Sequence, residues 1–171
     1  MAPQKVLLLG SGFVARPTLV ILSDAGIEVS VACRTIESAK ALCEGVKLAH
    51  PISLDVADES ALDAEVEKHD LVVSLIPYTF HAAVIKSAIK GKKHVVTTSY
   101  VSPAMMELDQ QCKDAGITVM NEIGLDPGID HLYAVKTIEE VHKVGKQLLG
   151  DSSGAGCKCL GASARRHQIG T

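Results

Sequence analysis

The sequence contains no tryptophan, and its other aromatic residues are three Tyr and two Phe among 171 residues. A folded core must therefore be built from aliphatic side chains, and hydrophobic residues make up 47% of the chain. That share excludes an intrinsically disordered chain, which lacks the apolar surface needed to offset the entropy of ordering. The length suits one domain, since domains usually have about 100 to 200 residues.

An excess of basic residues is also missing. The chain has 17 Lys and Arg against 20 Asp and Glu, and its net charge is -3. Proteins that bind nucleic acids carry clustered Lys and Arg, whereas the lysines here are scattered apart from the pair Lys92 and Lys93. We therefore expect no nucleic-acid partner.

Long apolar runs and a regular cysteine framework are absent as well. Four charged residues, Arg16, Asp24, Arg34 and Lys40, interrupt the first third of the chain, where a membrane helix would need about 20 apolar residues. The apolar run at 6–9 is too short for a secretory signal. The five cysteines are odd in number and irregularly spaced, which favours buried reduced thiols. We expect a cytoplasmic protein with no membrane contact.

Short aliphatic runs alternate with segments of helical period, which is typical of repeated βα units around a parallel sheet. We predict strands over residues 5–9, 28–33, 49–54, 71–76, 94–98 and 117–120. We predict helices over residues 14–25, 36–43, 59–68, 81–89 and 103–115. The predicted fold class is α/β, a Rossmann doubly wound parallel sheet with helices on both faces.

A glycine-rich motif, G-x-G-x-x-A, occupies residues 10–15 between the first predicted strand and the first predicted helix. In the dinucleotide-binding version of this turn, Gly10 makes the bend, Gly12 lets backbone approach a pyrophosphate, and Ala15 lets helix and strand pack closely. Amide groups at the helix N-terminus favour the anionic phosphates. A glycine turn that binds nothing is the alternative, but the strand-turn-helix setting favours a nucleotide site.

The residues at the end of the second predicted strand indicate whether the site binds NAD or NADP. Arg34 stands about 20 residues after Gly12, where NAD enzymes carry an Asp or Glu that binds the ribose hydroxyls. A cation there suits the 2′-phosphate of NADP, because a guanidinium can donate two charge-assisted hydrogen bonds to it. Thr35 and the backbone of Cys33 can add donors. A solvated surface arginine is the alternative.

Five longer blocks occur in order along the chain. They are Gly10-Ser11-Gly12-Phe13-Val14, Val31-Ala32-Cys33-Arg34-Thr35, Ile52-Ser53-Leu54-Asp55-Val56, the stretch from Ser74 to His81, and the stretch from Met120 to Ala134. Together they closely resemble the fungal saccharopine reductases, the NADP-dependent, L-glutamate-forming saccharopine dehydrogenases of lysine biosynthesis. The resemblance covers about residues 5–145, and it is specific to this family rather than to the fold alone.

The resemblance implies an oxidoreductase that acts on CH–NH bonds with NADP(H) as its cofactor. In that family, aminoadipate semialdehyde and glutamate condense to an imine, which NADPH reduces to saccharopine. The resemblance therefore implies small-molecule partners, namely saccharopine, glutamate and aminoadipate semialdehyde.

The resemblance also assigns binding residues. Around the pyrophosphate and the adenosine half of the cofactor it places Gly10, Ser11, Gly12, Phe13, Val14, Cys33, Arg34, Thr35, Asp55 and Val56. Toward the nicotinamide and at the far end of the cofactor it places Ile76, Thr98, Ser99, Leu125, Asp126 and Pro127. Facing the amino-acid substrate it places Ser99, Tyr100 and Asp126.

Tyr100 and Asp126 are the candidate catalytic residues. Both follow predicted strand ends, the edge at which α/β sheets bind ligands, and a phenol or a carboxyl can transfer the protons that imine chemistry needs. The hydride comes from the cofactor. The residues alone leave a second interpretation of Asp126 equally open, a turn residue before Pro127 and Gly128.

The chain departs from the family pattern after residue 145. The family continues into a second, α+β domain with further substrate contacts and the dimer surface, and this chain shows no counterpart of it. We expect an NADP-binding Rossmann domain over residues 1–146, with a linker helix at about 129–144, and an irregular Gly- and Ser-rich tail over 147–171. A truncated or frame-altered product is the favoured interpretation, and a natural short isoform is the alternative.

Two other functions compete with the family's reaction. A non-catalytic NADP-binding or regulatory module would need no substrate domain. Another imine-reducing or lyase-type relative is a further alternative, against which the block at 76–81 argues.

The cysteines and histidines are predicted to have no metal-binding role, and three of the histidines no catalytic role. Cys157 and Cys159 with His167 fit no zinc spacing, so no metal site is expected. Three histidines, His69, His81 and His94, are predicted to be helix caps or surface groups rather than catalysts. A fourth, His131, is the closest in sequence to the expected substrate cleft.

Overall fold

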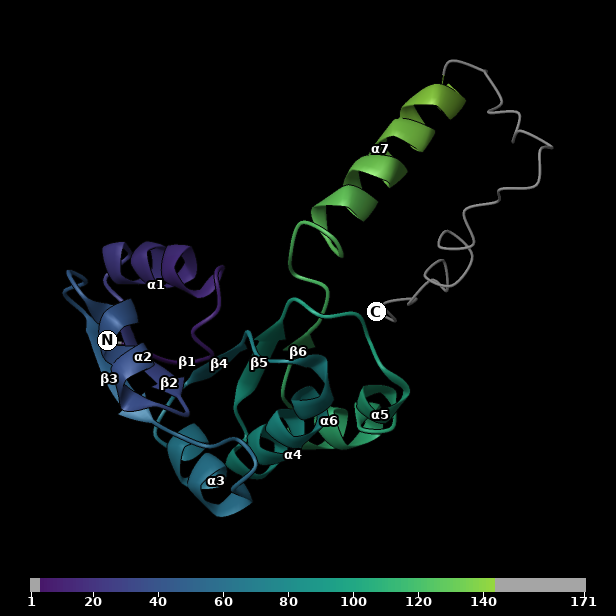
Figure 1. Cartoon of the computed structure of the whole chain (residues 1–171). Helices are drawn as coiled ribbons and strands as arrows, with labels where there is room; N and C mark the ends of the chain where they lie inside the picture. The colour runs from purple at the N-terminus through teal and green to yellow at the C-terminus, as the bar shows by residue number, and fades with distance from the viewer. Residues whose placement is uncertain (1–3, 144–171) are drawn as a thin grey trace. The chain divides into compact units, whose positions relative to one another are not determined.

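Six parallel strands form one sheet in the computed structural model, in the order β3-β2-β1-β4-β5-β6 (Figure 1). The structure describes residues 4–143. The strands are β1 (Lys5–Leu9), β2 (Glu28–Cys33), β3 (Ala49–Ser53), β4 (Leu71–Ser74), β5 (His94–Thr97) and β6 (Val119–Met120). This arrangement confirms the predicted Rossmann-type α/β fold.

Helices cover both faces of the sheet. The helices of the described residues are α1 (Ala15–Asp24), α2 (Ile36–Cys43), α3 (Glu59–Glu67), α4 (His81–Gly91), α5 (Pro103–Met106), α6 (Asp109–Ala115) and α7 (Ile129–Lys143), with a 3-10 turn, η1 (Tyr78–Phe80), before α4. Buried side chains of α1 and α2 pack against one face of the sheet, and those of α3 to α6 pack against the other.

The alternation of side chains along β1 builds both halves of the core. Val6 and Leu8 pack with α1 and α2, whereas Leu7 and Leu9 pack with the helices of the opposite face. All four are almost fully buried. A strand covered on both faces is apolar at every position, because successive side chains point to opposite sides.

Element boundaries match the predictions best in the first part of the chain, up to α2. The ranges of β1, β2 and α2 are those predicted. The strand predicted over 71–76 ends at Ser74, although the next amide, that of Leu75, still donates to the carbonyl of Leu9 at 2.9 Å. The strand predicted over 117–120 is confined to Val119–Met120.

One predicted helix, over 103–115, is in fact two. The amide of Leu108 donates to the carbonyl of Met105, three residues back, which is the tighter 3-10 pattern. The tightened turn places Met105 and Leu108 together in the core, at 5% and 3% exposure, before α6 begins at Asp109.

Arg16 on α1 ties this helix to the end of α2. Its guanidinium donates to the carbonyl of Leu42 at 2.8 Å and to that of Glu44 at 3.0 Å. These carbonyls have no intrahelical partner at a helix C-terminus, so the arginine caps α2 from outside.

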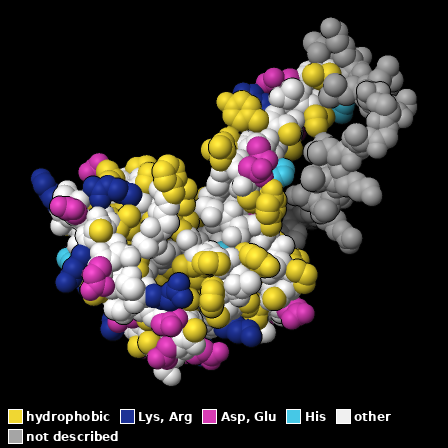
Figure 2. Space-filling view, in the orientation of Figure 1, with side chains coloured by type: hydrophobic (Ala, Val, Ile, Leu, Met, Phe, Trp, Pro, Cys, Tyr) yellow, Lys and Arg dark blue, Asp and Glu magenta, His cyan; other side chains and the backbone are white. Residues whose placement is uncertain are grey.

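Surface charges of both signs are interspersed on the face shown in Figure 2. Several form ion pairs, including Lys90 with Asp63 and Lys113 with Asp109, both at 2.7 Å. Exposed pairs of this kind contribute little to stability.

The chain divides into two compact units, one up to Leu132 and one from Tyr133 onward. α7 begins at Ile129, as predicted for the linker helix, and Leu132, Tyr133 and Val135 on it are more than half exposed. The predicted tail at 147–171, with its cysteines and His167, lies outside the described residues, so those interpretations stay predictions. Within residues 4–143, no helix combines the length and the apolar character required to cross a membrane.

Candidate nucleotide-binding site

The turn after β1 uses its two glycines in different ways. Gly10 has a φ of +108°, and a Cβ there would lie 2.6 Å from the carbonyl oxygen of Leu75, so only glycine fits the fold. A Cβ at Gly12 would meet no atom within 4 Å. The fold itself therefore does not require glycine at position 12, and the open space there would admit the close approach of a ligand.

A cleft of about 460 Å³ opens beside this turn, a size typical of small-molecule sites. It is formed at the carboxyl ends of β1, β2 and β4 and by the loop after β3. It is lined by Gly10, Ser11, Gly12, Ala32, Cys33, Arg34, Leu54, Asp55, Val56, Ala57, Leu75, Ile76, Pro77 and Phe80.

Much of the predicted cofactor site is therefore brought together by the structure. The predicted residues at the cleft are Gly10, Ser11, Gly12, Cys33, Arg34, Asp55, Val56 and Ile76. Sequence reasoning missed the apolar lining residues Leu54 and Pro77 and the aromatic Phe80. These residues could have been found from the sequence because they lie at or shortly after predicted strand ends.

The start of α1 offers donors to an anion. Its N-cap residue, Val14, has no side chain that could bond the first-turn amides, and the first turn carries no acidic residue. Such amides and the helix dipole attract negative charge. Phe13 and Val14 are exposed rather than in the cleft lining, at 100% and 54%, so any contact they make with a ligand lies at its rim.

Arg34 lies exposed at the end of β2, where its guanidinium can meet solvent or a ligand. Among the residues that the structure describes, no carboxylate forms an ion pair with it. The hydroxyls of Thr35 and Ser38 lie 2.8 Å apart at the start of α2. Ser38 was not predicted, because nothing in the sequence distinguishes it from other helix-surface serines.

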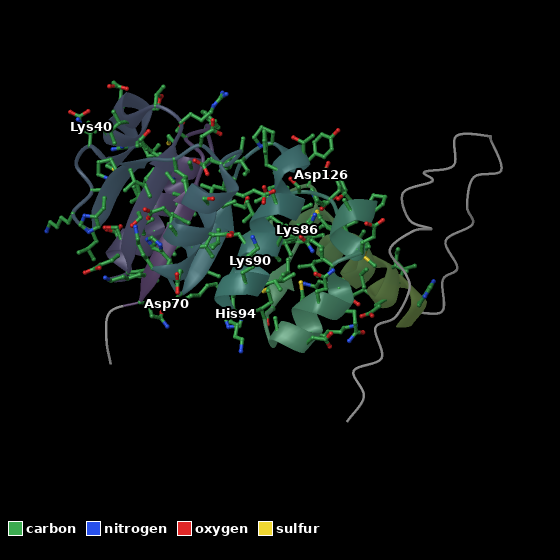
Figure 3. The ribbon with its side chains drawn as sticks, turned by 90° about the horizontal axis from the view of Figure 1, so that it is seen from below. Lys40, Asp70, Lys86, Lys90, His94 and Asp126 are labelled. Atoms are coloured by element: carbon green, nitrogen blue, oxygen red, sulfur yellow. The ribbon has the colours of Figure 1, made fainter. Side chains whose placement is uncertain are left out.

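A second cluster of predicted residues lies beyond the cleft lining, after β5 and β6. The hydroxyl of Tyr100 donates to the carboxylate of Asp126 at 2.5 Å. Figure 3 shows Asp126 at one edge of the sheet and Asp70 and His94 at the other. The two predicted catalytic side chains therefore meet at the carboxyl edge, where ligands of such sheets bind.

Glycine also shapes the turn that carries Asp126, together with Leu125 and Pro127. Gly128 has a φ of +146°, and a Cβ there would collide with the carbonyl oxygens of Gly124 and Glu122. On the strand side, Thr98 lies against Gly124. Pro127 is buried whereas Asp126 is exposed, so the turn holds the carboxylate outward.

The surface prediction is wrong for His81 and His69, but His69 does cap a helix, because its Nδ1 lies 2.7 Å from the Glu65 carbonyl in the last turn of α3. His81 and His69 are 1% and 5% exposed, and hydrogen bonds reach both nitrogens of each ring. Helix starts and strand starts suggested surface positions, but both rings fill polar gaps inside the fold. His94 is exposed at the start of β5, as predicted, and its Nδ1 accepts from the amide of Thr118 at 3.0 Å.

Comparison with known proteins decides the family. The family described as "Saccharopine dehydrogenase NADP binding domain" matches residues 6–120. The chain belongs to this family. A saccharopine dehydrogenase [NADP(+), L-glutamate-forming] of Pyricularia oryzae is 76% identical over 148 residues, which are 86% of this chain and 33% of the relative. The Saccharomyces cerevisiae protein of the same name is 60% identical over 148 residues, covering 85% and 32%.

Solved structures agree with this assignment. The apo saccharopine dehydrogenase (L-Glu forming) of Saccharomyces cerevisiae matches with a TM-score of 0.77 and 60% identity, over 83% of this chain and 32% of that one. A biliverdin reductase from Synechocystis, with a TM-score of 0.57 at 19% identity, shares the fold alone. The chain spans about a third of the length of the fungal relatives.

Proposed function

We propose that the chain binds NADP(H) in the cleft beside the Gly10–Gly12 turn, as the cofactor domain of a saccharopine dehydrogenase. The observation that carries the proposal is the position of Arg34, which has no ion-pair partner among residues 4–143 and lines the same cleft as the glycine turn. The pyrophosphate would lie on the amides that follow Gly10, and Arg34 with Thr35 would hold the 2′-phosphate.

The remaining contacts follow the strand order. On the adenine side we assign Cys33, Asp55 and Val56. On the nicotinamide side we assign Ile76, Thr98, Ser99, Leu125, Asp126 and Pro127. Ser11, Gly12, Phe13 and Val14 would surround the pyrophosphate.

We further propose that the whole protein's reaction is that of its relatives, reduction of the imine of aminoadipate semialdehyde and glutamate to saccharopine in lysine biosynthesis. Bound NADPH supplies the hydride. Tyr100 and Asp126 are joined by a hydrogen bond at the same edge, so a proton can pass between the phenol and the carboxyl and on to the substrate nitrogen. Ser99 would bind the amino-acid substrate beside them.

Calorimetric titration with NADPH and NADH tests the cofactor assignment. Arg34→Ala should weaken the binding free energy of NADPH by about 1.5 to 3 kcal/mol, the contribution of charge-assisted hydrogen bonds, and leave that of NADH nearly unchanged. Lys86→Ala is the matched control, because Lys86 is an exposed cation on α4 outside the cleft lining (Figure 3). Equal losses for both cofactors would show that Arg34 does not read the 2′-phosphate.

We also propose a cytoplasmic location for the full-length protein. Three cysteines within the described residues, Cys33, Cys43 and Cys112, are buried free thiols, which suits a reducing compartment. The mouse relative, 43% identical over 144 residues, is named as a mitochondrial alpha-aminoadipic semialdehyde synthase. Fractionation of cells that express the tagged full-length protein separates the two locations.

A further inference from the structure

His81 lies at the N-terminus of α4 with its imidazole inside the protein, at 1% exposure. Its Nδ1 lies 2.9 Å from the Ser74 hydroxyl, and its Nε2 lies 2.8 Å from the Ser99 hydroxyl and 3.1 Å from that of Thr97. The ring therefore links the end of β4, the start of α4 and the segment that follows β5. A buried imidazole needs such partners, because an unpaired polar group inside a protein is costly.

Ser99 is the least buried residue of this hydrogen-bond network, and it follows the carboxyl end of β5. Ser74, Thr97 and His81 are all at most 1% exposed, whereas Ser99 is half-buried. The Ser99 backbone is also fixed, because its amide donates to Thr97 Oγ1 at 3.2 Å and its carbonyl accepts from the Glu122 amide at 3.2 Å. The hydroxyl of Ser99 is thus held by His81, while the residue itself remains partly accessible.

The strand order indicates which part of a dinucleotide would meet Ser99. The glycine turn follows β1, and Arg34 follows β2 on one side of it. A pyrophosphate at the turn with a 2′-phosphate at Arg34 leaves the nicotinamide half to extend over β4 and β5, on the other side. Ser99 lies beyond the end of β5 on that side.

We propose that His81 is a positioning residue, which holds the Ser99 hydroxyl in the orientation that binds the nicotinamide half of NADP(H). This inference rests on the proposed cofactor site. A serine hydroxyl can donate one hydrogen bond and accept others, and the bond to His81 fixes which side remains for the ligand. Because the hydroxyl is oriented before the ligand arrives, less ordering is needed on binding.

The charge state of the ring agrees with this role. Burial lowers the pKa of His81 below its usual range, so the imidazole is neutral at pH 7. A neutral ring can donate from one nitrogen and accept at the other, and the hydroxyls on its two sides can satisfy either arrangement.

Two substitutions of His81 test the hydrogen bonds of its two ring nitrogens separately. Asn places its amide near the position of Nδ1, so His81→Asn keeps a partner for Ser74 and abandons Ser99. Gln reaches the position of Nε2, so His81→Gln keeps a partner for Ser99. We expect His81→Asn to lower the affinity for NADPH about 5- to 10-fold, the contribution of one hydrogen bond. The affinity of His81→Gln for NADPH should stay within about 2-fold of that of the wild type.

A second ligand distinguishes this inference from the cofactor site on which it rests. The nucleotide 2′,5′-ADP carries the adenosine 2′-phosphate but has no nicotinamide half, so its affinity should not change in either variant. If the wild type binds neither NADPH nor 2′,5′-ADP, the proposed cofactor site is wrong. If both ligands bind and His81→Asn weakens them equally, or weakens neither, the positioning role is wrong.

A double-mutant cycle with Ser99→Ala tests whether His81 acts through Ser99. The double variant should bind NADPH within about 2-fold of Ser99→Ala alone, because the two changes remove the same contact. Additive losses would overturn the proposal. His69→Asn is the matched control, because His69 is also buried with both nitrogens bonded but lies next to Asp70, at the opposite edge of the sheet in Figure 3. It should leave NADPH affinity unchanged.

A measurement on the wild type covers the case in which the His81 variants do not fold. In protein with ¹⁵N-labelled histidine, NADPH should shift the ring nitrogens of His81 and leave those of His69 unchanged, and 2′,5′-ADP should shift neither. Ser99→Ala, at a half-buried position, identifies the His81 signals by changing them in the free protein. Signals of His81 that do not respond to NADPH would overturn the proposal.

Discussion

At the scale of single residues, substitutions of Gly10 and Gly12 should have different effects although both glycines lie in one turn. Gly12→Val places a side chain in open space beside the cleft, so we expect the fold to survive and NADPH binding to be lost. Gly10→Ala forces a Cβ against the carbonyl of Leu75 at a positive φ, and should lower the free energy of unfolding by about 1 to 3 kcal/mol. Urea unfolding and calorimetric titration measure both effects, and a Gly12→Val protein that still binds NADPH would show that the turn is only structural.

His81 also makes the stability of the protein depend on pH. Burial lowers the pKa of its imidazole in the folded state below the ordinary value of 6.5. As the pH falls through 6.5, the unfolded chain takes up the proton first, so the free energy of unfolding decreases until the folded-state pKa is reached. Urea unfolding from pH 7.5 to 5.5 should show a smaller decrease for His81→Gln, which has no titratable group there. Identical slopes would contradict the prediction.

The sequence predicts those site residues whose role is carried by a local motif. Gly10, Gly12 and Arg34 could be found because the turn and the strand end define their positions along the chain. His81 could not, because its partners Ser74, Thr97 and Ser99 converge only after two strands and a helix have packed. Tyr100 and Asp126 could be placed at one edge, but their direct hydrogen bond depends on the conformation of two loops.

At the scale of elements, helix α3 depends on a side-chain cap. Asp58 Oδ1 accepts from the amides of Ser60 and Ala61 at 3.0 and 3.1 Å. We expect Asp58→Ala to lower the free energy of unfolding by about 1 kcal/mol. Thr35, the N-cap of α2, makes no side-chain bond to that helix's amides, so Thr35→Ala should cost less. Chemical denaturation of both variants measures the difference, and equal losses would show that the Asp58 bonds contribute nothing specific.

The elements that were predicted well are those whose pattern is decided locally. A strand such as β1 is apolar from Val6 to Leu9, and α2 is bounded by residues that end a helix, so their limits can be read from the chain. The break between α5 and α6 could not be predicted, because no glycine or proline marks it between Ala104 and Ala115. The shortening of β6 to Val119–Met120 was missed as well, because the extent of the strand is set by its pairing with β5 in the folded sheet.

At the scale of the whole molecule, we expect the 171-residue polypeptide to bind NADPH but not to turn over saccharopine. The residues proposed to hold the pyrophosphate and the adenosine half are gathered mostly in one cleft, whereas catalysis requires the substrate to be held at both of its amino-acid ends. Ser99, Tyr100 and Asp126 would supply only part of these contacts, and the sequence has no Arg between Arg34 and Arg165 that could clamp a carboxylate. A steady-state assay of NADPH absorbance in both directions decides the question. Turnover comparable to that of a full-length relative would contradict the prediction.

The link from Arg16 to the end of α2 bears on how the protein opens locally. Amide hydrogen exchange reports the free energy of such openings, and segments that open together exchange with the same value. Because Arg16 joins the helix of the pyrophosphate turn to the helix that follows Arg34, we expect α1 and α2 to exchange as one cooperative unit. Arg16→Ala should let the last turn of α2 exchange faster than α1, and the glycine turn and the Arg34 end of the cleft would then fluctuate independently.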